Sequence, residues 1–367
     1  MSPPALFTPL KLRHLNLANR IVIAPMCQYS ARDGCMNDWH LMHLGNLAQS
    51  GAGLLTIEAS SVSPEGRITY GDVGLYDDAT EAAMARVLDH IRRYSDMPVA
   101  IQLSHAGRKA SCDVPWQGGT PLAPDHPNGW QTQAPSAVPF DPRATPPTAL
   151  DAAGLAQVRD DFAAAAMRSG RLGLDAVQVH VAHGYLLHEF LSPLSNRRDD
   201  QYGGSLENRA RFPLEVFDAV RAAFTADRSV TLRISATDWV DGGFTPQEAI
   251  AFSRMAEARG VDAIHVSSGG LHPDQKIPVG PGYQVPLARA VKAAVGIPVV
   301  AVGLITDPSH AEAIIANGDA DMIALARTIL YDPRWPWHAA AALGGQIKAA
   351  NQYLRCQPAQ HRNLFKV

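Results

Sequence analysis

Eight short runs of consecutive apolar residues recur along the chain, and helix-like segments separate most of them. Runs rich in Val, Ile and Leu on both faces are typical of parallel strands that are covered on both sides. The runs are Ile21–Met26, Ala52–Glu58, Val99–Ser104, Leu174–His180, Val230–Ser235, Val261–Val266, Ile297–Val302 and Ala320–Leu325. Eight strands alternating with helices predict an α/β protein with a (β/α)₈ TIM barrel, whose active site lies at the carboxyl ends of the strands. A doubly wound sheet is the alternative, but no Gly-x-Gly-x-x-Gly motif follows an early strand.

Local signals support the helices between these runs. Apolar residues recur at helical spacing from Phe212 to Phe224, and Thr245-Pro246-Gln247-Glu248 has the pattern of a capped helix start. Asn317-Gly318 is typical of a helix end.

The length of the chain, 367 residues, suits one such barrel, so we predict a single domain over 1–367. Residues 106–148 are rich in Pro and Gly and too long for an ordinary connection. We interpret them as a functional loop or small hairpin that caps the barrel mouth after strand 3. Residues 345–367 are interpreted as a C-terminal tail that could lie at a subunit interface.

Composition argues against several classes of protein. The formal net charge is -3 and no basic patch occurs, so we expect no nucleic-acid partner. No span of 18 apolar residues predicts a membrane helix, and residues 1–7 lack the pattern of a secretory signal. The four cysteines are scattered without metal or disulfide spacing. These features together predict a cytoplasmic protein.

The segment His180-Val-Ala-His183-Gly-Tyr185 follows one of the predicted strands. Two imidazoles and a phenol at this spacing could hold a carbonyl oxygen and deliver a proton beside it. A lone histidine at a strand end is more often structural, and His-x-x-His could also bind a metal. If both rings donate hydrogen bonds to a substrate, their other nitrogens need partners.

Other predicted strand ends carry further polar residues. Gln102 has a donor and an acceptor that match an imide edge, and Arg233 is a fixed positive charge near the pocket floor. Gly303 and Ala326-Arg327 follow the last two strands, where such barrels bind phosphate. No carboxylate accompanies the histidines, so we predict no metal site. The set suits a planar, electron-accepting heterocycle that carries a phosphate.

Over essentially its whole length the chain resembles the Old Yellow Enzyme family of flavin-dependent ene-reductases. The resemblance is closest to the bacterial xenobiotic-reductase, or thermophilic-like, branch. The motifs that carry it are Phe7-Thr8-Pro9-Leu10, Leu17-Ala18-Asn19-Arg20-Ile21, Ala24-Pro25-Met26-Cys27-Gln28-Tyr29, His105-Ala106-Gly107-Arg108-Lys109-Ala110, His180 to Leu186, Phe190-Leu191-Ser192-Pro193, Asn196-Arg197-Arg198, Asp200 and Tyr202 to Arg209.

The resemblance implies a role for each matching residue. FMN would rest on Ala24, Pro25, Met26, Cys27, Ala59, Gln102 and Arg233, with its phosphate near Gly303, Ala326 and Arg327. His180 and His183 would donate to the carbonyl oxygen of the substrate, and Tyr185 would protonate its α-carbon. Cys27 would tune the flavin and contact the substrate, and Tyr29 would close over the substrate. Arg355, in Gln352-Tyr353-Leu354-Arg355, would reach the active site of a neighbouring subunit.

The resemblance therefore implies an FMN-dependent ene-reductase that takes hydride from NADPH, with NADH possible, in a ping-pong mechanism. Its substrates would be enones, enals and maleimides, and it would form a homodimer or homotetramer. Two alternatives stay open at this stage. One is a metal-dependent lyase or aldolase on the same barrel, and the other is a non-catalytic flavin-binding barrel.

Overall fold

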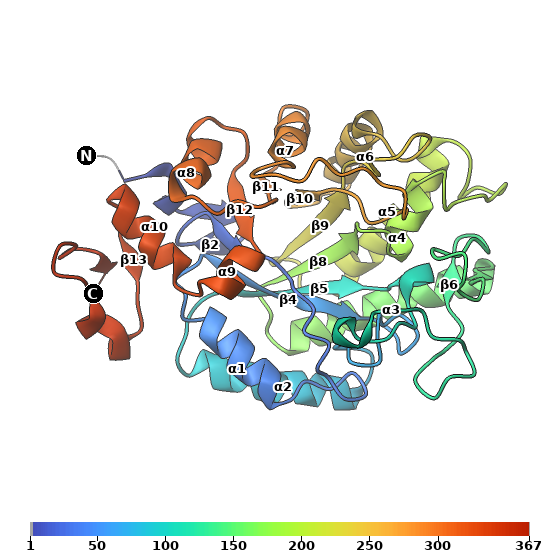
Figure 1. Ribbon diagram of the computed structural model, residues 1–367, viewed down its shortest axis with the longest axis horizontal. Coiled ribbons are helices and arrows are strands. Elements are labelled where there is room, and N and C mark those ends of the chain that lie inside the picture. The colour runs from blue at the N-terminus through green and yellow to red at the C-terminus, as the bar shows by residue number, and fades with distance from the viewer. Residues whose placement is uncertain (1–2, 367) are drawn as a thin grey trace.

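Eight parallel strands close into a barrel, which confirms the predicted (β/α)₈ architecture (Figure 1). The structure is a computed structural model that describes residues 3–366, so residues 1, 2 and 367 of the predicted domain lie outside it. Around the barrel the strands follow the order β10-β11-β12-β3-β4-β5-β8-β9. Their bounds are Ile21–Ile23 (β3), Leu54–Ser61 (β4), Val99–Ser104 (β5), Ala176–Val181 (β8), Ser229–Ser235 (β9), Ile264–Ser267 (β10), Val299–Ala301 (β11) and Met322–Leu325 (β12). Each overlaps one of the eight predicted runs.

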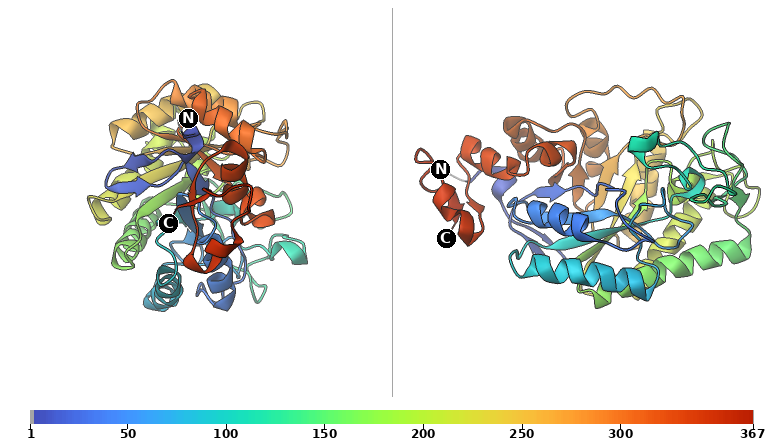
Figure 2. Two further views of the ribbon diagram at one scale, coloured as in Figure 1. Left: turned by 90° about the vertical axis from the view of Figure 1, so that its left-hand side faces the viewer. Right: turned by 60° about the horizontal axis from the view of Figure 1, so that its bottom comes forward.

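Helices surround the barrel, as two further views show (Figure 2). They are α1 (Asp38–Leu47), α2 (Asp78–Arg92), α3 (Ala152–Arg171), α4 (Leu186–Leu191), α5 (Leu206–Ala223), α6 (Pro246–Ala258), α7 (Val285–Lys292), α8 (Pro308–Ala316), α9 (Arg327–Tyr331) and α10 (Trp335–Leu343). The capping box predicted at Thr245 and Glu248 is present, and α8 ends at Ala316 with Asn317 as its C-cap, as expected. Among residues 3–366, no helix is long and apolar enough to cross a membrane.

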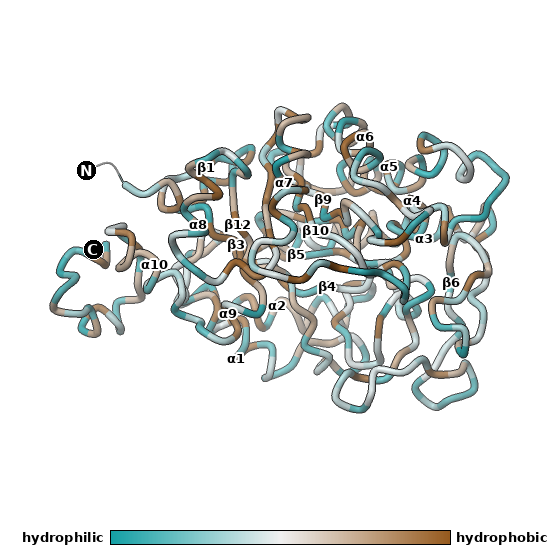
Figure 3. Tube along the Cα trace, turned by 45° about the horizontal axis from the view of Figure 1, so that its top comes forward, coloured by the Kyte–Doolittle hydropathy of each residue, from teal (hydrophilic) through white to brown (hydrophobic). Residues whose placement is uncertain are grey.

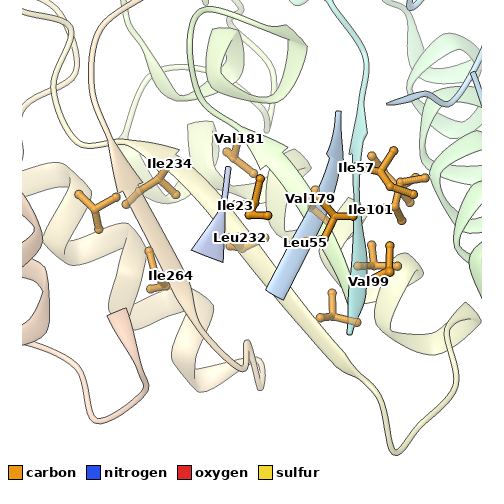
Figure 4. Close-up of a cluster of buried hydrophobic side chains, with 14 of the residues drawn as sticks. Ile23, Leu55, Ile57, Val99, Ile101, Val179, Val181, Leu232, Ile234 and Ile264 are labelled. Carbon is orange, nitrogen blue, oxygen red and sulfur yellow. The ribbon is translucent and has the colours of Figure 1, made fainter. Parts of the chain in front are cut away.

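The pleat of the strands divides the interior into two layers. Successive side chains of a strand point to opposite faces, so bulky residues such as Ile23, Ile101 and Leu232 pack outward against the helices (Figure 4). Burying each such side chain stabilises the fold by about 1.5–3 kcal/mol. The inward positions near the amino ends of the strands carry apolar residues, mostly Ala and Val, and the hairpin of β1 (Leu10–Leu12) and β2 (Leu15–Leu17) covers them. Apolar stretches accordingly lie along the strands in Figure 3.

The segment 106–148 lies at the carboxyl ends of the strands. It contains the short turns η2 (Gly107–Lys109) and η3 (Pro115–Gln117) and the two-residue strand β6 (Gln133–Ala134). β6 pairs in parallel with β7 (Thr148–Ala149), so the segment is a loop rather than a hairpin. In Figure 1 this capping loop and β6 lie at the right of the molecule.

The C-terminal tail lies at the opposite end of the molecule from β6 (Figures 1 and 2). It contains β13 (Ile347–Lys348), the 3-10 helix η4 (Asn351–Cys356) and β14 (Phe365–Lys366). Trp337 of α10 contacts Tyr353 and Phe365, with ring centroids 6.0 and 4.8 Å away. The tail therefore packs on α10 and away from the barrel mouth.

Candidate active site

Three predicted site residues point into the barrel near its mouth. Gln102 on β5, His180 on β8 and Arg233 on β9 take inward positions, since the apolar residues on either side of each pack outward. The parallel register pairs Arg233 with His180 on one side and with His265 of β10 on the other. Strand pairing therefore brings residues from distant parts of the sequence into one polar layer.

Arg233 is a buried cation that has no protein partner. Only 8% of the residue is exposed, and its guanidinium forms no hydrogen bond or ion pair with any residue from 3 to 366. Burial lowers the pKa of Arg233 to about 10, so it stays charged at neutral pH. Because an unpaired buried charge is costly, this position needs an electron-rich or anionic group. A flavin ring, which gains negative charge when it is reduced, fits that requirement.

Gln102 is held by a residue that the sequence did not single out. Its Nε2 donates to Oε1 of Gln178, one strand away, at 2.8 Å. This contact orients the amide so that its oxygen is left to accept from a ligand. Next to it, β4 contains a bulge: Ile57 pairs with Ile101 but Ala59 pairs with Gln102, so Glu58 is an extra residue. The bulge places the small Ala59 beside Gln102, as a flat ligand requires.

Glu58 supports the segment that follows β3. Its Oε1 accepts from the backbone N–H of Gln28 at 3.0 Å, and burial raises the pKa of Glu58 to about 8. His40 Nε2 lies 4.0 Å from the other oxygen, and burial lowers the pKa of His40 to about 4. Both groups are therefore neutral near pH 7, and the contact is not an ion pair.

Cys27 lies in the segment that follows β3. Burial raises the pKa of its thiol well above the usual value, and the nearby Asp72 and Glu58 carboxyls act in the same direction. The backbone of Ala59 and the charge of Arg233 act in the opposite direction. The thiol is therefore neutral and lies among the residues predicted to carry the flavin ring.

His180 and His183 face each other across a short gap. Nε2 of His180 lies 3.3 Å from Nδ1 of His183, and the two rings are nearly perpendicular. The outer nitrogens have the partners that the sequence could not show. Nδ1 of His180 accepts from the backbone N–H of Ala182 at 3.2 Å, and Nε2 of His183 lies 2.7 Å from Oγ of Ser267.

Tyr185 lies against the edge of His180, with ring centroids 5.1 Å apart. Burial, followed by the nearby Cys27 and Tyr29, raises the pKa of Tyr185 well above 10, so the phenol is protonated at neutral pH. Nζ of Lys109 lies 5.2 Å from the Tyr185 ring centroid. It also donates to the backbone oxygens of His183 and Gly270, each at 2.9 Å. Lys109 therefore joins the capping loop to the loops after β8 and β10.

The residues predicted to bind phosphate lie after β11 and β12. Gly303 has φ +127°, and a Cβ there would lie 3.0 Å from Nε2 of Gln284, so glycine is required. Ala326 precedes α9 and the side chain of Arg327 is exposed. Burial raises the pKa of Tyr283, whereas Arg327 and Arg233 lower it. Both cations therefore act electrostatically on the same phenol.

A cavity of about 270 Å³ opens under the capping loop beside this site. Tyr29, Lys109, Trp130 and Phe140 line it, and the aromatic edge of Tyr29 packs on Trp116 at 6.3 Å between centroids. Arg355 is exposed on η4, in the tail at the opposite end of the molecule. It is therefore not brought to the site of its own chain.

The part of the chain that the structure describes contains no set of metal ligands. No group of three or more His, Cys, Asp or Glu side chains there could hold an ion.

Residues 5–345 match the NADH:flavin oxidoreductase / NADH oxidase family. The chain belongs to this family. The match confirms the resemblance drawn from the sequence motifs, so the protein is an enzyme, a flavin oxidoreductase.

The curated relatives of this flavin oxidoreductase agree with the family assignment. The NADPH dehydrogenase of Geobacillus thermodenitrificans is 41% identical over 352 residues, covering 95% of this chain and 98% of the relative. That of Bacillus subtilis is 40% identical over 353 residues, with the same shares covered. Among solved structures, morphinone reductase has a TM-score of 0.78 at 28% identity, covering 100% of this chain and 97% of the other.

Three residues of the flavin oxidoreductase site were not assigned a role from the sequence: Glu58, Gln178 and Ser267. Ser267 had a usable signal, because it ends the sixth strand and a Gly-Gly pair follows shortly after. The other two act through a contact between distant segments or through a bulge, which local sequence does not reveal.

Proposed function

We propose that this flavin oxidoreductase binds FMN and uses NADPH to reduce the C=C bond of α,β-unsaturated carbonyl compounds. NADH would serve as a second donor, and the substrates would be enones, enals and maleimides. The observation that carries the proposal is the unpaired, buried Arg233 beside two histidines whose inner nitrogens converge. The unpaired arginine needs an electron-rich ring, and the pair of histidines suits an oxygen that gains negative charge.

The residues around the ring would divide the work of binding. Gln102 would pair with its imide edge, Arg233 would oppose the charge of its reduced form, and Cys27 would lie against it. The phosphate would be held near Gly303, Ala326 and Arg327. When bound, the flavin would supply a hydride to the β-carbon of the substrate.

The chain's own side chains would complete the reaction. As the carbonyl oxygen becomes an enolate, N–H groups of His180 and His183 would stabilise it, and losing one such donor costs about 10²–10³ in rate. Burial lowers the pKa of both histidines well below 6.5, so they act as neutral donors. Tyr185, kept protonated by its raised pKa, would deliver a proton to the α-carbon. Tyr29 would close over the substrate, and donor and acceptor would bind in turn.

We also propose that Arg355 acts in a neighbouring subunit, in a homodimer or homotetramer. The support is its exposure on η4 and the position of the tail far from the mouth of its own barrel. Location in the cytoplasm stays a prediction.

The deciding experiment is an anaerobic absorbance spectrum of the purified protein supplied with FMN. NADPH is added first and 2-cyclohexen-1-one second. Bleaching by NADPH followed by recovery with the enone is the expected result. Uptake of FMN without bleaching would favour the non-catalytic flavin barrel, and failure to take up FMN would overturn the proposal.

A further inference from the structure

We propose that the buried pair of His188 and Asp238 positions the two candidate catalytic residues on either side of Gly184, by holding the backbone N–H of this glycine. Both are positioning residues: they act through the backbone between His183 and Tyr185 and would not touch the substrate. The inference deepens the proposed function and rests on it for the reaction. The contacts themselves are properties of the chain alone.

The backbone between the two candidate catalytic residues has a conformation that needs support. His183 and Gly184 both have positive φ, +61° and +74°, and a Cβ at Gly184 would collide with the backbone oxygen of Gly270. A non-glycine residue such as His183 is uncommon in this left-handed region. The turn sets the directions in which the side chains of His183 and Tyr185 leave the backbone. Loss of the turn would therefore move both side chains.

Three elements anchor this turn, and they bind different backbone groups. The N–H of His183 donates to Oγ of Ser235 on β9 at 2.9 Å, and its carbonyl oxygen accepts from Lys109 of the capping loop. The N–H of Gly184 donates to Nδ1 of His188 on α4 at 2.9 Å, and this is its only hydrogen bond to any residue from 3 to 366. Because His188 is fully buried, removing its nitrogen would leave this N–H without a partner, which is costly.

The contact with Gly184 determines which nitrogen of His188 carries the proton. A backbone N–H can only donate, so Nδ1 accepts and the ring proton is on Nε2. Nε2 lies 3.0 Å from Oδ1 of Asp238, and neither atom forms a hydrogen bond with any other group in residues 3–366. A carboxylate at this distance favours the Nε2–H form of the ring, because its charge attracts the N–H hydrogen.

Asp238 is itself fixed and ionised. Its Oδ2 accepts from the hydroxyl of Ser192 at 2.7 Å and from the N–H of Phe244 at 2.6 Å. Burial raises the pKa of Asp238, but His188 and these two donors outweigh burial and hold the pKa below its usual value. The carboxylate therefore presents its Oδ1 to His188 at neutral pH. A continuous series of contacts thus leads from Asp238 through the His188 ring to the N–H of Gly184.

The first test compares His188→Leu with His188→Asn. Both variants remove the ring and leave Asp238 without its partner, so they share any loss of stability from that source. Asparagine keeps an oxygen near the position of Nδ1 that can accept from Gly184, whereas leucine has no acceptor. We expect enone reoxidation to slow about 10²-fold in His188→Leu, the scale of a small displacement of catalytic groups, and to recover largely in His188→Asn. Flavin reduction by NADPH should change less, because it needs no proton from Tyr185.

Asp238→Asn tests the other member of the pair and keeps the size of the side chain. Its amide oxygen would accept from Ser192 and Phe244, which turns the NH₂ group toward His188. Nε2 would then accept, and the ring proton would move to Nδ1, where it opposes the N–H of Gly184. We expect the same slowing of enone reoxidation, although the His188 ring is still present. Ser192→Ala is the matched control with normal reoxidation, since it removes one contact of Asp238 but not the contact with His188.

The amide of Gly184 gives a direct readout of the contact. His183-Gly184 is the only His-Gly step in the sequence, so labelling with carbonyl-¹³C histidine and ¹⁵N glycine selects this one amide. We expect slow hydrogen exchange in the wild type, His188→Asn and Ser192→Ala, and fast exchange in His188→Leu and Asp238→Asn. Exchange is measured with and without FMN, and bleaching by NADPH is recorded on the same samples, so a failure of the proposed function is seen separately.

Slow exchange at Gly184 in both His188→Leu and Asp238→Asn, or normal enone reoxidation in both, would overturn the inference. Equal slowing in His188→Leu and His188→Asn would also overturn it, because the ring would then act by its packing and not as an acceptor.

Discussion

Replacing Lys109 by Met tests whether the capping loop holds in place the loop after β8, which carries His183. Methionine keeps an unbranched side chain but removes the ammonium that binds the oxygens of His183 and Gly270. The segment that Lys109 holds has an uncommon backbone conformation, with φ +61° at His183 and +74° at Gly184. Gly270 presses on it so closely that a Cβ there would lie 2.6 Å from the His183 backbone.

The magnitude follows from two opposing effects. Each hydrogen bond from a charged donor contributes about 1.5–3 kcal/mol, so the two contribute about 3–6 kcal/mol. Burial opposes them, because it lowers the pKa of Lys109 from 10.5 to about 8, and at 1.36 kcal/mol per unit this costs about 3 kcal/mol. The free energy of unfolding should therefore fall by about 2 kcal/mol. Enone turnover should fall further, by about 10²-fold, because small displacements of catalytic groups have effects of that size.

The assay combines urea unfolding with separate anaerobic measurement of flavin reduction by NADPH and reoxidation by the enone. Lys276→Met is the matched control, since Lys276 is an exposed lysine in the loop after β10. We expect reoxidation by the enone to slow in Lys109→Met and not in the control. Normal reoxidation together with normal stability would refute the reasoning that Lys109 positions this loop.

Three further changes give independent checks. Tyr185→Phe should slow reoxidation by the enone about 10²-fold or more while NADPH still bleaches the flavin; an equal loss in both steps would contradict a dedicated proton donor. Cys27→Ala should shift the flavin midpoint potential by roughly 20–30 mV, the equivalent of about 1 kcal/mol in a two-electron couple, and an unchanged potential in spectroelectrochemistry would place the thiol away from the ring. Glu58→Gln should flatten the pH dependence of stability. The pKa of Glu58 is raised from 4.5 to about 8, so between these values the folded protein holds a proton that the unfolded chain has released. Wild-type stability should therefore fall by a few kcal/mol as pH rises through this window. Urea unfolding at pH 5 and pH 8 would show this, and parallel trends in wild type and variant would be incompatible with a protonated Glu58.

Much of the architecture could be predicted because it depends on local pattern. All eight predicted runs overlap barrel strands, since a strand covered on both faces must be apolar throughout. The capping box at Thr245 depends on residues within one turn of helix, and it too was predictable. The motif around His180 placed the candidate donors at a strand end, where this fold carries its active site.

The tertiary structure decided which groups meet. Whether the capping loop was a loop or a hairpin depended on the parallel pairing of β6 with β7, which the sequence pattern does not specify. The bulge at Glu58 and the contact of Gln178 with Gln102 depend on the register between strands, which apolar runs do not specify.

The same limit applies to the hydrogen bonds of the site. Residue types alone identified His183 as a candidate donor, but the Ser267 hydroxyl that its outer nitrogen contacts lies 84 residues away. The sequence by itself therefore determined the barrel and the identity of its candidate catalytic residues, because these follow from patterns within single elements. Only the closed barrel decided their partners and charges, because hydrogen bonds and burial arise between segments that folding brings together.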